Sequence, residues 1–124
     1  LGASPSSFNS LVYKQSTNQV FAIYSTGIAV INCSTNTVTT NWTVPIATSY
    51  HSAYNSVNDE IYITSLSTGR YISVDAVSGS IITNTLIPSP SAPYDVLVYT
   101  PTNTIYVSDT APTNPKLLEI CGSV

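Results

Sequence analysis

Charged residues are scarce in this sequence of 124 residues, at 7% of the chain with six acidic and three basic side chains. Ordinary globular proteins carry about 25%. Three basic residues cannot form the clusters of lysine and arginine that bind nucleic acids, so we expect no nucleic-acid partner. Ser, Thr and Asn supply most of the polarity instead, and such a surface changes little in charge with pH. This favours a secreted protein that meets a harsh or acidic medium.

Long apolar runs are also missing, and none approaches the roughly 18 residues of a membrane span. No window shows sustained helical periodicity, so we predict no long helix. Hydrophobic residues nevertheless reach 43% of the chain, enough for one folded domain. Val, Ile, Thr and Tyr dominate, which indicates strands. Because the sequence begins with Leu1 rather than Met, we expect either a removed leader or a fragment of a longer chain.

One short segment occurs three times at intervals of 41 and 44 residues. The copies are TNQVFAIYS at 17–25, NDEIYITS at 58–65 and TNTIYVSD at 102–109. The flanks repeat as well, since IAVINCSTNTV at 28–38 matches YISVDAVSGSI at 71–81. Each unit reads as short strands separated by turns that contain Asn, Asp or Gly. Repeat units are therefore expected at about 8–49, 50–93 and 94–124, within a single all-β domain covering 1–124.

Eleven strands are predicted in these units. First strands are expected at 10–13, 52–55 and 95–99, second strands at 20–25, 61–65 and 105–109, third strands at 28–33, 71–76 and 117–121, and fourth strands at 38–43 and 81–86. Four antiparallel strands in some 40 residues is the size of one β-propeller blade.

The segment IPSPSAPYDVLVYTPTNTIYVSD at 87–109 resembles the YVTN-type β-propeller repeat of archaeal and bacterial surface-layer proteins. That family joins a Gly- or Pro-containing linker to an inner strand, a Pro-x-Asn turn and an Ile-Tyr-Val strand. AVINCSTNTV resembles the strand and turn that follow in the family, with Asn32 and Asp75 at its Asp position. The resemblance covers nearly the whole chain and implies three propeller blades in an extracellular surface protein.

Two features depart from a complete propeller. Propellers close with about four to eight blades, and this chain has three units. The third unit also stops before a fourth strand, which leaves the edge formed by Leu117, Leu118 and Ile120 unpaired. The chain is therefore a piece of a larger propeller, a subunit that assembles with other chains, or a two-sheet β-sandwich.

Cys33 and Cys121 are the only cysteines, and each ends a predicted third strand. In a secreted chain two cysteines suggest a disulfide, which needs Cα atoms within about 7 Å. In a propeller the second unit separates the first from the third, so an intrachain bond would favour the sandwich. Two thiols that are buried or bonded to another chain are the alternative. No second Cys/His pair supplies a metal site, and we predict no metal and no cofactor.

His51 is the only histidine, and Asn9 and Asp95 occupy the matching positions of the other units, each after an aromatic residue. If the first strands are innermost, these three polar side chains converge near one end of the axis. They are the candidate binding site for a small ligand or ion. A polar cap on each inner strand explains the same pattern without function.

Motifs of catalysis are missing: the six carboxylates form no marked pair, and there is no nucleophile elbow or phosphate loop. NCS and NWT make Asn32 and Asn41 candidate N-glycosylation sites, of which Asn41, on an outer strand, is the better. Trp42 is expected to face the neighbouring blade as core.

The function expected from these features is non-enzymatic. An extracellular surface-layer or filament protein would act in assembly or adhesion, through self-association or contact with other surface proteins and glycans. The alternatives are a fragment of a propeller enzyme of lactonase-like or peptidase-associated type, with its site near Asn9, His51 and Asp95, and a carbohydrate-binding module that uses exposed tyrosines.

Overall fold

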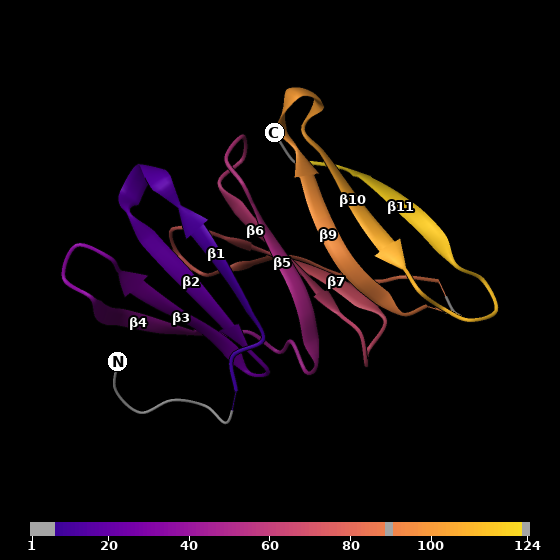
Figure 1. Ribbon diagram of the computed structural model, residues 1–124, viewed down its shortest axis with the longest axis horizontal. Coiled ribbons are helices and arrows are strands. Elements are labelled where there is room, and N and C mark those ends of the chain that lie inside the picture. The colour runs from indigo at the N-terminus through magenta and orange to yellow at the C-terminus, as the bar shows by residue number, and fades with distance from the viewer. Residues whose placement is uncertain (1–6, 89–90, 123–124) are drawn as a thin grey trace.

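The computed structural model describes residues 7–88 and 91–122, and these form eleven β-strands and two short 3-10 turns, η1 (Gln15–Thr17) and η2 (Thr100–Thr102). No helix in this part of the chain is long and apolar enough to cross a membrane. The strands fall into three separate antiparallel sheets, seen side by side in Figure 1. The fold is thus all-β, as predicted, and the two-sheet sandwich is wrong.

Each sheet is one repeat unit, here called blade 1, blade 2 and blade 3. Blade 1 contains β1 (Ser10–Lys14), β2 (Gln19–Tyr24), β3 (Gly27–Asn32) and β4 (Thr37–Thr43). Blade 2 contains β5 (Ser49–Asn55), β6 (Glu60–Ser65), β7 (Arg70–Asp75) and β8 (Ile81–Leu86). Blade 3 contains β9 (Pro93–Tyr99), β10 (Thr104–Asp109) and β11 (Lys116–Cys121). Neighbouring strands follow chain order in every blade, and the third blade has three strands in the described residues.

The turn between the first two strands of each blade is fixed by one residue type. Asn18, Asp59 and Asn103 directly precede the second strand, and their φ angles are +51°, +58° and +52°. This left-handed conformation is costly for most side chains, but Asn and Asp tolerate it. The repeated Asn or Asp in the sequence therefore sets the same turn, and the same register, three times.

A second repeated turn follows the third strand of blades 1 and 2. The side-chain oxygen of Asn32 accepts a hydrogen bond from the backbone N–H of Ser34 at 2.8 Å. Asp75 accepts two such bonds at 2.8 Å, from the N–H groups of Val77 and Ser78, and these bonds lower the pKa of its carboxyl group. Asn32 and Asp75, which stand at the Asp position of the family named above, therefore each cap a turn.

The blades stack in chain order, with β5 lying against both β1 and β9. Blade 1 and blade 2 bury one apolar core between them, and blade 2 and blade 3 bury another. The first core includes Phe21, Ile23, Ile61, Ile63, Ile72 and Val74, and the second includes Tyr62, Val96, Ile105 and Val107. The first strands are therefore the neighbouring strands of successive blades, as expected of inner strands.

Trp42, on the outer strand β4, packs at the border between blades 1 and 2. Its ring stacks on Phe21 with the centroids 5.4 Å apart and the planes at 27°. A Cβ atom added at Gly79, in the turn before β8, would overlap the Trp42 ring. The prediction that Trp42 contacts the neighbouring blade is confirmed.

Candidate functional site

The inner strands of blades 2 and 3 are interrupted at the same place. Relative to its partner strand, β5 carries an extra residue within 49–52, and β9 carries one within 93–96. These matching β-bulges hold His51 and Asp95 outside the regular ladder. Bulges are common beside binding and active sites because they redirect side chains.

Hydroxyl groups of the second strands replace the missing ladder bonds. The backbone N–H of His51 donates to Thr64 Oγ1 at 3.3 Å, and that of Asp95 donates to Ser108 Oγ at 3.1 Å. The Thr64 hydroxyl also donates to the backbone carbonyl of Tyr94 at 2.7 Å, which ties blade 2 to blade 3 beside the two bulges.

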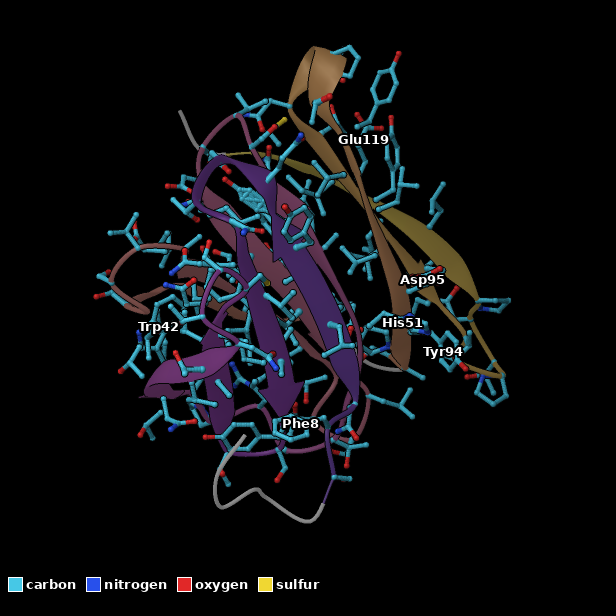
Figure 2. All side chains as sticks on the ribbon, turned by 60° about the vertical axis from the view of Figure 1, so that its left-hand side comes forward. Phe8, Trp42, His51, Tyr94, Asp95 and Glu119 are labelled. Carbon is cyan, nitrogen blue, oxygen red and sulfur yellow. The ribbon has the colours of Figure 1, made fainter. Side chains whose placement is uncertain are left out.

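The structure brings His51 and Asp95 together, with Nδ1 of the imidazole 3.5 Å from Oδ1 of the carboxylate. The His51 ring also lies 5.1 Å from the Tyr94 ring, and Figure 2 shows the three side chains grouped at one end of β9. The His51 and Asp95 side chains are 43% and 65% exposed. An imidazole beside a carboxylate can exchange protons, but water screens a pair this exposed.

Asn9 stands apart from this pair. Its backbone N–H donates to the carbonyl of Ile23 at 2.8 Å, and β1 pairs with β2 without a bulge. By strand pairing Leu11 matches Ser52, so Ser10 rather than Asn9 matches His51. The hydroxyl oxygens of Ser10 and Ser52 lie 2.5 Å apart. The aromatic residue before Asn9 suggested the wrong alignment by one residue.

A second candidate site is a cavity of about 450 Å³ between blades 1 and 2. It is lined by the side chains of Tyr13, Gln15, Ser16, Tyr54 and Ser56, at the ends of β1 and β5. Two phenol rings with hydroxyl and amide groups suit a small polar ligand that stacks on an aromatic face. The sequence did not reveal it, because its lining comes from turns 40 residues apart.

Beside this cavity, Lys14 forms an ion pair with Asp59 at 2.8 Å, and Tyr54 donates a hydrogen bond to the same carboxylate at 2.7 Å. The Lys14 side chain is 5% exposed and that of Asp59 is 38% exposed. Burial, together with the hydrogen bond to Asp59 and its negative charge, raises the pKa of Tyr54 to about 12. The cluster joins the two blades.

Cys33 and Cys121 are both free and exposed, so they form no disulfide with each other and the alternative of buried thiols is wrong, whereas a bond to another chain stays a prediction. Cys121 is the last residue of β11, whereas Cys33 follows the end of β3. Of the two sequons, Asn41 is exposed on β4 and Asn32 caps its turn as described above. Among the described residues, no group of three His, Cys, Asp or Glu side chains is placed to hold a metal ion.

The predicted assembly edge divides into two kinds of residue. In the described part of the chain β11 pairs only with β10, so its outer edge is open. Leu117 is 69% exposed on one side of the strand. Leu118 and Ile120 point to the other side and pack against the core between blades 2 and 3.

No protein-family model matches the sequence, and no curated protein matches it either. Several solved structures are similar in fold. Hydrazine synthase of Kuenenia stuttgartiensis is 13% identical with a TM-score of 0.70, over 94% of this chain and 36% of that one. Sqt1 of Saccharomyces cerevisiae is 11% identical with a TM-score of 0.70, over 94% of this chain and 32% of that one.

The β-propeller domain of Cps50 (Swd1) from Myceliophteria thermophila is 6% identical with a TM-score of 0.66, over 91% of this chain and 38% of that one. The chain has a β-propeller fold. It spans about a third of the length of each of these three proteins.

Proposed function

We propose that this chain is a non-enzymatic, extracellular structural protein of the surface-layer or filament type, acting in assembly or adhesion. The observation that carries the proposal is the open edge of β11. In blades 1 and 2 a fourth strand covers the third, whereas in blade 3 the third strand is left uncovered among the described residues. An uncovered strand presents unpaired N–H and C=O groups that pair readily with a strand of another chain.

The surface chemistry supports an extracellular role. The chain has few charges, and the resemblance of 87–109 to the YVTN-type repeat associates the fold with cell surfaces. Asn41 lies exposed in its sequon, where a glycan could attach. The two exposed thiols are the feature that fits this location least, because oxidising compartments favour disulfides. Antibody labelling of intact source cells tests the location, and labelling only after permeabilisation would contradict it.

The edge itself is tested with a peptide that supplies the absent strand. A synthetic peptide of the fourth strand of blade 2, Ile81–Leu86 with short polar flanks, should pair with β11 and dissolve the assemblies. A scrambled peptide of the same composition is the control. This probe is sharper than Ile120→Pro, because Ile120 also packs in the core, so the proline would destabilise the fold. Assemblies that persist at saturating peptide would refute the role of the edge.

The contact between His51 and Asp95 favours a second candidate, a fragment of a propeller enzyme. One fold hosts many activities, so the hydrazine synthase named among the similar structures does not transfer its reaction to this chain. The candidate predicts a hydrolytic activity, measured on a panel of lactones and peptides, that His51→Ala removes. Full activity in that variant would eliminate the site.

The cavity between blades 1 and 2 favours a third candidate, a carbohydrate-binding module. Sugars stack on aromatic rings, and Tyr13 and Tyr54 both line the cavity. A glycan-array signal that Tyr13→Ala abolishes would support this candidate, with Tyr24→Ala, at the end of β2 far from the cavity, as the control. An equal loss in both variants would show that the binding lies elsewhere.

A further inference from the structure

The two interfaces between blades use the same positions of the repeat. Each blade has a leading face, turned toward the preceding blade, and a trailing face, turned toward the following one. Strand pairing places Leu11, Tyr13, Val20, Ala22, Ala29 and Ile31 on the leading face of blade 1. It places Leu97, Tyr99, Tyr106, Ser108, Leu117 and Glu119 on the trailing face of blade 3.

Polar contacts repeat along with the apolar ones. From the trailing face of blade 1, Lys14 donates to Asp59 in the turn of blade 2 at 2.9 Å. From the trailing face of blade 2, Asn55 donates to Asn103 in the turn of blade 3 at 2.7 Å. Lys14 and Asn55 are both the last residues of first strands, and both acceptors are the left-handed turn residues. The chain thus builds one interface twice.

The two halves of this interface are left uncovered at the ends of the stack. On the leading face of blade 1, Leu11 is 66% exposed, although the matching Val96 of blade 3 is 6% exposed. On the trailing face of blade 3, Leu117 is 69% exposed, although the matching Ile28 of blade 1 is fully buried. The exposed residues are therefore interface residues by their position in the repeat.

We propose that a second copy of this chain covers both faces. The trailing face of blade 3 of each copy then docks on the leading face of blade 1 of the other copy. The occupant follows from continuity, because in the described residues the trailing faces of blades 1 and 2 are each covered by the leading face of the next blade. Three blades cannot close a ring, whereas two copies supply six, within the four to eight that propellers use. A head-to-tail contact that closes in this way gives a two-fold dimer.

This inference rests on the proposed function in one respect, the self-association of the chain, and it names a second copy as the partner. The ring uses the faces of the end blades and leaves the outer edge of β11 at its rim. The repeated polar contact also predicts the register of the new interface. Tyr99, the last residue of the first strand of blade 3, comes to lie beside Asn18 of the second copy.

The first test is a charge on either face. Leu117→Asp and Leu11→Asp each place a carboxylate in an apolar interface, and we expect each to weaken dimerisation by about 100-fold or more. Both side chains are exposed in the single chain, so the blades should fold normally. Val77→Asp is the matched control, because Val77 is 71% exposed in a turn outside both faces and should leave dimerisation unchanged.

Mixing the two variants tests the head-to-tail geometry. Each variant alone spoils both contacts of the ring, whereas the mixture retains one native contact between the unaltered blade 3 of one copy and the unaltered blade 1 of the other. The mixture should therefore form heterodimers in sedimentation velocity. A monomeric wild-type chain, whose faces would then be free for blades of a longer protein, would overturn the proposal. So would normal dimerisation of Leu11→Asp, which would indicate a contact between two copies of blade 3.

The outcome also separates this inference from the proposed function. Assemblies that the strand peptide dissolves but that both charge variants form normally would uphold the edge and overturn the ring. Dimers that the charge variants abolish, in a protein with no larger assemblies and no surface location, would uphold the ring and overturn the proposed function.

Discussion

The ion pair between Lys14 and Asp59 gives the most quantitative test of how the blades are joined. The Lys14 side chain is 5% exposed, so the ammonium group depends on the carboxylate that lies 2.8 Å away. Removing one partner of a buried pair costs about 3–5 kcal/mol. Asp59→Asn keeps an acceptor oxygen and a residue that tolerates the left-handed turn, so we expect a smaller loss of about 2–3 kcal/mol.

The reverse change should cost less. Lys14→Met fills the same space without charge and leaves a carboxylate that is 38% exposed and still bonded to Tyr54. Because water solvates that carboxylate, the loss should be about 1 kcal/mol or less. The double variant replaces the pair with uncharged groups and should be more stable than Asp59→Asn alone.

Urea unfolding followed by the fluorescence of Trp42 measures these differences, since this residue stacks on Phe21 in the same interface. With a slope of about 1–3 kcal/mol per molar urea, Asp59→Asn should lower the midpoint by about 1 M. An equal loss in the two single variants, or additive losses in the double variant, would refute the asymmetry that burial predicts.

Three further results are expected. The pKa of Tyr54 rises to about 12 in the fold from an ordinary value of 10.0, so the contribution of Tyr54 to the free energy of unfolding is complete below pH 10.0 and is lost as pH rises to about 12. Tyr54→Phe should flatten this decline, measured by urea unfolding at each pH. Gly79→Ala should cost about 2 kcal/mol or more and shift the emission of Trp42, because the added methyl group meets the ring at a φ of +76°, and unchanged emission would contradict this contact. Thiol titration of the native chain should label both Cys33 and Cys121 without reductant, and a chain with no reactive thiol would contradict their exposure.

The strands and their order could be predicted because local chemistry determines them. Residues such as Asn18 and Gly79 mark turns by their backbone preferences, and the alternating apolar residues between such turns indicate strands. Repetition added a third kind of evidence, since a pattern read three times in order predicts a repeated sheet. The open edge of β11 followed from the same comparison, because no strand that corresponds to β8 follows β11 in the described residues.

The sites could be predicted only in part, because they depend on contacts between distant segments. Lys14 and Asp59 are 45 residues apart, and nothing near Lys14 in the sequence indicates a buried partner. Asn9 was aligned with His51 by the aromatic residue before each, whereas the extra residue in β5 shifts the true match by one. A bulge leaves no clear sequence signal of its own, and only the strand pairing shows it.

The most direct test of the central claim is the native mass of the intact chain by light scattering, with and without reductant and with saturating strand peptide. If the end blades dock head to tail, the peptide-saturated protein has a mass of about 26 kDa, twice the 13.2 kDa of one chain, plus bound peptide. Reductant should not change this value, because the contact is made by blade faces rather than thiols. A mass of one chain under these conditions would contradict the account.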